Sequence, residues 1–249
     1  AEVSAAACAA LAKVGTDNEL EGLIQLALAG KTPAASAALQ AIASRARDKS
    51  AAAQKLIALA KTAPQQQMAS LFEILALLGG NDALAVLSNS VGGSNEEVKD
   101  AAIRALANWP DFAATTPLLM IASDPNTKRV HNVLAIQGIA RLVKSSDKEP
   151  AALRLKAAIA GMNAAARDEE KKLMLSALAS VPDRTAGEEI KPFLSNPKYQ
   201  EEAGLAAVTL AEALRKTDKP AAKDLAEAVK KAAVSDEATR RANALLKKN

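Results

Sequence analysis

The chain has 249 residues, of which 49% are hydrophobic and only 2% are aromatic, and its formal net charge is +4. Sixty residues are Ala, the strongest helix former, so the composition predicts an all-α protein. The single Cys, Cys8, excludes an internal disulfide, and no apolar run is long enough for a transmembrane helix, so we expect no membrane insertion. The positive charge is concentrated in residues 215–249, which hold ten Lys and Arg against five Asp and Glu. This distribution argues against a general polyanion-binding surface.

A short motif recurs along the chain. The stretch VKDAAIRALANWPD at 98–111 shares six identical positions with EKKLMLSALASVPD at 170–183. Their common core is an apolar residue, any residue, a small residue, an apolar residue and a small residue. Copies of this core, some of them loose, begin at Cys8, Leu39, Phe72, Ile103, Ile136, Leu175, Leu205 and Ala242. A spacing near 33 residues predicts an array of stacked helical repeats.

Each period holds two helical patterns separated by turn signals. In 111–146, apolar residues follow one helical face before Asp124-Pro125-Asn126 and a second face after it. Gly79-Gly80 and Gly92-Gly93 are predicted to lie at helix C-termini. We therefore predict two helices per repeat, the second carrying the motif. In chain order, after a lone second-type helix at 1–15, the predicted repeats span 17–47, 48–80, 81–110, 111–146, 147–182, 183–217 and 218–249.

The best-formed copies point to a known family. The stretch Leu118–Pro125 (LLMIASDP), followed by Lys128-Arg129-Val130 and Ala135–Leu142 (AIQGIARL), is similar to a HEAT repeat, and Glu97–Ala107 is similar as well. The resemblance implies an all-α, armadillo-like fold: a right-handed α-solenoid of about seven helical hairpins forming a single domain, 1–249. It also implies that the second helices form a concave surface that binds a partner.

The sequence departs from the family pattern in ways that leave another type of α-solenoid as an alternative fold. Lys99 stands where HEAT repeats usually have Arg. The period is shorter than the HEAT value of 40 or more and closer to the 34 residues of tetratricopeptide repeats, although the aromatic positions of that pattern are empty here. Another helical-hairpin solenoid is therefore the alternative fold.

The sequence offers little for catalysis. His131 is the only His, which argues against a metal cluster or a His-based triad, and we expect no metal and no cofactor. Some HEAT-like proteins are DNA glycosylases, a role in which Trp109, Asp111 and Arg104 could act on a base. Handling of bases normally uses several stacking aromatic residues, so Trp109 is better interpreted as a core residue between repeats. We therefore expect a non-catalytic protein-binding or scaffolding module. The alternatives are a nucleic-acid-binding module and an enzyme of the glycosylase or cofactor-lyase type.

Two sets of residues are candidates for binding. No acid occurs between Asp124 and Asp147, and this stretch contains a candidate strip for an acidic partner: Lys128, Arg129, His131, Gln137, Arg141 and Lys144. The alternative is a solvated face on which Arg141 and Lys144 pair with Asp100 or Glu169. The second set is the residue after each motif anchor, which should point away from the core and line the concave surface: Gln40, Glu73, Arg104, Gln137, Ser176 and Ala206. Nucleic acid is the less favoured partner.

The two ends of the chain differ in polarity. The last predicted helix, 235–247, is charged around a narrow apolar stripe, which suits a terminal cap. The first helix has almost no charge, and the chain begins with Ala1 rather than Met. We therefore expect the first helix to be an edge covered by an upstream repeat of a longer chain or by another molecule. The compartment is not indicated, and a signal peptide at the missing start would mean export.

Overall fold

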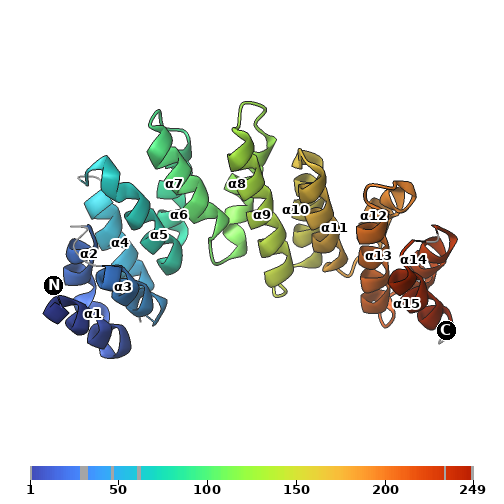
Figure 1. Cartoon of the computed structure of the whole chain (residues 1–249), viewed down its shortest axis with the longest axis horizontal. Helices are drawn as coiled ribbons and strands as arrows, with labels where there is room; N and C mark the ends of the chain where they lie inside the picture. Colours follow the sequence, from blue (N-terminus) through green and yellow to red (C-terminus); the bar gives the residue numbers. More distant parts are fainter. Residues whose placement is uncertain (1, 29–32, 46–47, 61–62, 233, 248–249) are drawn as a thin grey trace. The chain divides into compact units, whose positions relative to one another are not determined.

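Helices are the only regular secondary structure in the described part of the molecule. The computed structural model describes residues 2–28, 33–45, 48–60, 63–232 and 234–247, and no β-strand occurs among them (Figure 1). None of these helices is long and apolar enough to cross a bilayer. Residues 1–114 and 115–249 form two compact units, called unit 1 and unit 2 below.

Unit 1 is built from helices that pair with their sequence neighbours. Its α-helices are α1 (Glu2–Val14), α2 (Leu20–Leu28), α3 (Pro33–Arg45), α4 (Lys49–Ala60), α5 (Met68–Leu78), α6 (Asn81–Val91) and α7 (Glu96–Ala107). Short 3₁₀ turns occur at Asp17–Glu19, Gln65–Gln67 and Phe112–Ala114. Helices α2 and α3, α4 and α5, and α6 and α7 contact each other as pairs, and the odd-numbered helices α1, α3, α5 and α7 contact one another in succession.

Unit 2 repeats this organisation. Its helices are α8 (Thr115–Ser123), α9 (Arg129–Ser145), α10 (Ala151–Ala164), α11 (Asp168–Ala179), α12 (Arg184–Ile190), α13 (Gln200–Leu214), α14 (Lys219–Ala232) and α15 (Asp236–Lys247), with a 3₁₀ segment η4 at Lys191–Ser195. Each even-numbered helix contacts the odd-numbered helix that follows it, and α9, α11, α13 and α15 contact one another in succession (Figure 1).

The motif explains why these segments are helices and which face they bury. Every copy lies in an odd-numbered helix, and its two apolar anchors, three residues apart, share one helical face. In α3, α7 and α9 these anchors are fully buried: Leu39 and Ile42, Ile103 and Leu106, Ile136 and Ile139. Burial of each such side chain contributes about 1.5–3 kcal/mol. The core of each unit therefore runs along its odd-numbered helices.

The predicted register is wrong in α13. We expected Leu205 as the anchor and Ala206 as the exposed neighbour, but Leu205 is half-buried and Ala206 is 5% exposed. The buried anchor is Val208, and Thr209 is the exposed residue after it. Val208 lies 33 residues after Leu175, so the correction also brings this copy to the common period.

Glycines end two helices as predicted. Gly79 follows α5 and Gly92 follows α6. Gly79 and Gly80 have φ values of 74° and 92°, a left-handed conformation that other residues adopt only with strain. The pair therefore permits the tight connection from α5 to α6.

Candidate interaction surface

The candidate strip divides into two groups on α9. Lys128 and Arg129 are exposed at the start of the helix, whereas Gln137, Arg141 and Lys144 are exposed on one face of its C-terminal half. At 1.5 Å per residue, Arg129 and Arg141 lie about 18 Å apart along the axis. Partial burial lowers the pKa of Arg141. The strip is therefore two separate basic groups rather than one continuous site.

His131 does not belong to the exposed strip, which corrects the sequence expectation. Its side chain is 2% exposed, because it lies on the core face of the first turn of α9. Its neighbour Asn132 is also buried and donates from Nδ2 to two carbonyl oxygens, of Ala122 at 2.9 Å and Ala164 at 3.1 Å. These carbonyls lie at the C-terminal ends of α8 and α10. Asn132 therefore satisfies a terminal carbonyl of its own repeat and one of the next. Asn132, in the first turn of α9, therefore joins this helix to both neighbouring even-numbered helices.

Polar side chains link each odd-numbered helix of unit 2 to the next. Lys144 Nζ donates to Ser176 Oγ across α9 and α11 at 3.1 Å. Lys172 of α11 pairs with Glu202 of α13 at 2.6 Å. Such links are partly exposed to solvent, so each is worth about 0–1 kcal/mol.

The last link joins α13 to α15. Arg241 donates from Nε to Glu212 at 3.0 Å and from Nη2 to the Thr209 hydroxyl at 3.1 Å. Thr209 is the exposed residue that takes the place predicted for Ala206, and Ser176 occupies the corresponding place on α11. The exposed faces of α9, α11, α13 and α15 therefore form one linked surface, which we call the odd-helix face of unit 2.

Unit 1 presents the other predicted residues of this kind. Gln40, Glu73 and Arg104 are all exposed, and their helices α3, α5 and α7 contact in succession. Arg104 Nε donates to Asp100 within α7 at 2.7 Å, and this carboxylate raises the pKa of Arg104.

Trp109 is fully buried, so it cannot stack on a base, and the glycosylase assignment loses its aromatic residue.

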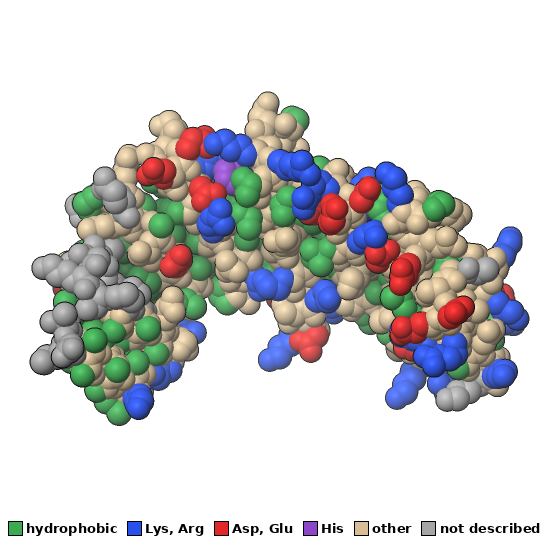
Figure 2. All heavy atoms as spheres, viewed as in Figure 1, with side chains coloured by type: hydrophobic (Ala, Val, Ile, Leu, Met, Phe, Trp, Pro, Cys, Tyr) green, Lys and Arg blue, Asp and Glu red, His purple; other side chains and the backbone are tan. Residues whose placement is uncertain are grey.

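The two units differ in charge. Residues 115–249 contain 40 charged side chains and residues 1–114 contain 20, with net charges of +6 and −2. On the face of unit 2 seen in Figure 2, acidic and basic side chains are interspersed. Where the pKa of a carboxylate is shifted among the described residues, it is lowered: Glu19 by Thr16, Asp168 by the Tyr199 hydroxyl and Asp218 by Arg184. A lowered pKa means that the ionised carboxylate is favoured, whereas a general acid must hold its proton.

The described residues contain no cluster of three or more His, Cys, Asp or Glu side chains arranged to hold a metal ion. Exposed apolar residues occur on several helices. Met120 of α8 is 71% exposed and Leu153 of α10 is 50% exposed. In α1, Cys8 is buried, while Val14 is 77% exposed and four Ala residues are exposed: Ala6, Ala7, Ala9 and Ala10.

Sequence reasoning missed the buried polar contacts that join repeats. Arg154 is 6% exposed and donates from Nε to Val143 O at 2.8 Å and from Nη2 to Ser180 O at 3.0 Å. Arg154 therefore supplies hydrogen-bond donors to carbonyl groups at the C-terminal ends of α9 and α11. A second buried polar residue acts within one repeat: Glu170 is 2% exposed and accepts two hydrogen bonds from Arg167, at the start of the same helix.

A sequence signal for the exposed contacts exists at the repeat period. Oppositely charged residues that pair across repeats lie 29 to 34 residues apart, as in Lys172–Glu202, Arg184–Asp218, Lys191–Asp224, Lys198–Asp168 and Arg241–Glu212. A search for opposite charges one period apart would have found them.

Comparison with known proteins gives no relative. No family model matches the chain, and no match was found among curated proteins or among solved structures.

Proposed function

We propose that the chain is a HEAT-like α-solenoid of about seven helical hairpins that binds a protein partner on its odd-helix face, with no catalytic activity of its own. The supporting observation is the linked surface on α9, α11, α13 and α15. Its helices contact in succession and present exposed polar side chains at the repeat spacing. Stacked repeats use surfaces of this kind for extended binding.

The charge pattern favours a protein over a nucleic acid. A phosphate backbone calls for a run of available cations. On the odd-helix face of unit 2, Lys172 pairs with Glu202 and Arg241 pairs with Glu212 and Glu237. Arg141 and Lys144 form a basic group on α9. We therefore expect a partner with an acidic segment that lies beside α9 and a mixed polar segment along α11 to α15.

Site-specific photocrosslinking tests this function. A photoreactive residue at Ser176 or Thr209 would be irradiated in extracts of the native cells, with Met120 on α8 as the matched control. We expect adducts from Ser176 and Thr209, but not from Met120, that are degraded by protease and resist nuclease. Nuclease-sensitive adducts would favour the nucleic-acid alternative, and equal adducts from all three positions would reject the odd-helix face as the binding surface.

A further inference from the structure

A small groove lies between the even-numbered helices α12 and α14 of unit 2. Its volume is about 220 Å³, and it is lined by Arg184, Glu188, Pro220, Ala221, Asp224 and Leu225. Leu225 is buried and forms an apolar floor. The helices come close there because Gly187 has no side chain: a Cβ atom at this position would lie 3.0 Å from Leu225 Cδ1.

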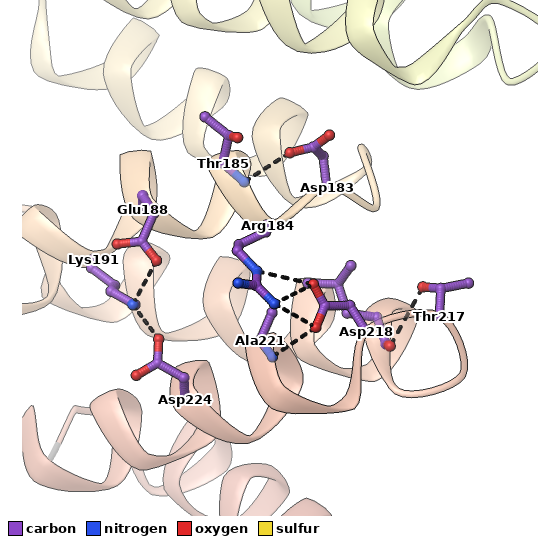
Figure 3. Close-up of polar contacts among 10 residues, drawn as sticks. Asp183, Arg184, Thr185, Glu188, Lys191, Thr217, Asp218, Ala221 and Asp224 are labelled. Carbon is purple, nitrogen blue, oxygen red and sulfur yellow. Dashed lines mark hydrogen bonds and ion pairs between the residues drawn. The ribbon is translucent and has the colours of Figure 1, made fainter.

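One end of the groove holds an Arg–Asp ion pair, and the other holds two carboxylates around one Lys. At one end, Arg184 of α12 donates from Nε and Nη2 to the Asp218 carboxylate at 3.0 Å each (Figure 3). Asp218 is itself held by the backbone N–H of Ala221 at 3.1 Å, so the guanidinium is oriented by a fixed partner. Two of its five N–H groups are used in this way, and Nη1 has no hydrogen bond within the described part of the chain. An Arg held along one edge still presents its other edge to a second carboxylate.

At the other end, two carboxylates converge on one cation. Glu188 of α12 and Asp224 of α14 both contact Lys191 Nζ, which lies between them (Figure 3). The side chains of Glu188 and Asp224 are 59% and 58% exposed, whereas that of Lys191 is 25% exposed. Two negative charges share one positive charge, so this end retains a net negative charge that faces solvent.

The size and spacing of the groove indicate the kind of ligand. Sites for whole small molecules usually measure about 300–1,000 Å³, so this groove is suited to a few side chains of a larger partner. Arg184 and Glu188 lie four residues apart on α12, which is about 6 Å along the helix axis. A partner helix places an acid and a base four residues apart on one face at the same spacing.

From this geometry we infer that the α12–α14 groove is a second docking site, for a helical segment of a protein partner that carries an acid and a base one turn apart with an apolar residue between them. The acid contacts the free edge of Arg184, the base contacts Glu188 and Asp224, and the apolar side chain lies over Leu225. The inference does not depend on the odd-helix face, because a different set of helices forms the groove.

A helical peptide library provides the test. The probe is an 18-residue Ala-rich host, long enough to be helical in water, with four neighbouring positions on one face randomised. It would be selected on the immobilised full-length chain, and the affinity of enriched peptides would then be measured against the wild type, Arg184→Gln, Glu188→Gln/Asp224→Asn and the control Lys198→Gln. Lys198 is a matched control because it also forms an exposed ion pair across repeats, with Asp168 at 3.3 Å, outside the groove.

We expect enriched peptides to carry the acid and the base four residues apart. Arg184→Gln should weaken their binding at least tenfold, and neutralising the acid of the peptide should then have no further effect on that variant. Glu188→Gln/Asp224→Asn should weaken the same peptides through their base, and Lys198→Gln should bind them as the wild type does. Far-ultraviolet circular dichroism checks that each variant is folded. The inference is overturned if no peptide is enriched, if the enriched peptides lack the charge pair, or if Arg184→Gln binds them with unchanged affinity.

Discussion

Replacing the buried Arg154 should destabilise unit 2 more than any exposed charge substitution. Its guanidinium donates to Val143 O and Ser180 O, which belong to the C-terminal ends of two successive odd-numbered helices. A hydrogen bond to a charged group contributes about 1.5–3 kcal/mol, and a buried carbonyl left without a donor costs about 1–3 kcal/mol. Met preserves most of the aliphatic stem and removes both donors. For Arg154→Met we therefore expect a loss of about 2–5 kcal/mol in the free energy of unfolding.

Two further variants separate the causes. Arg154→Lys keeps the charge but loses the fork of donors, so we expect roughly half of that loss. Lys156→Met removes an exposed cation from the same helix and should change the free energy of unfolding by less than about 0.5 kcal/mol.

The assay is urea unfolding followed by circular dichroism, combined with hydrogen exchange. In Arg154→Met, the amides at the C-terminal ends of α9 and α11 should exchange faster, because Arg154 contacts the carbonyls of those turns. A free energy of unfolding for Arg154→Met within about 0.5 kcal/mol of the wild type would refute the reasoning. So would an equal effect from Lys156→Met.

Three other outcomes are expected. The Arg184 and Ala221 hydrogen bonds lower the pKa of Asp218 below its ordinary value of 3.8, so their contribution to stability is present above the unfolded-state pKa and is lost as the pH falls through the folded-state pKa. An NMR titration of the Asp218 carboxyl carbon should show this lower midpoint, which Arg184→Gln should raise; a wild-type midpoint at or above 3.8 would contradict the assignment. Arg141→Gln/Lys144→Gln should abolish adducts from a photoreactive residue at Ser176 while changing the free energy of unfolding by less than about 1 kcal/mol, and unchanged crosslinking would show that the α9 group is only a solvated face. Deleting 218–249 should leave the amides of α9 and α11 protected from exchange, because α11 is separated from the deleted helices by α13; loss of protection there would contradict a repeat-by-repeat architecture.

The positions of the odd-numbered helices were predictable because their anchors are distinctive. Leu39 and Ile42 in α3, like Ile103 and Leu106 in α7, are large apolar residues among small or polar ones, so only one face can be buried. In α13 the pattern is ambiguous, because Leu205 and Val208 lie three residues apart in a stretch rich in Ala. Leu205 fits the motif as first anchor, whereas Val208 is followed by Leu210 and Glu212 where small residues are expected. Only packing against neighbouring helices selects Val208.

The candidate sites were less predictable for a related reason. Steps of three and four residues describe one helix in isolation, and they placed Gln137, Arg141 and Lys144 correctly on one exposed face. The same reasoning gave no information about a helix one repeat away. The groove depends on contacts of that second kind, between Arg184 and Asp218 and between Lys191 and Asp224. His131 shows the converse error, because its polarity suggested a surface position and packing of the first turn of α9 buried it.

The contacts between repeats also determine how a chain of this type can change its copy number. Asn132 donates to the Ala164 carbonyl and Gln200 donates to the Ala232 carbonyl, each a main-chain group 32 residues further on. Every amino acid supplies such a carbonyl, so a duplicated or deleted whole repeat would still offer these bonds to its new neighbour. The charge pairs are different, because Lys191 requires an acid such as Asp224 one period away. The main-chain acceptors are therefore present whichever repeat follows, whereas each charge pair forms only with a repeat that carries the matching acid.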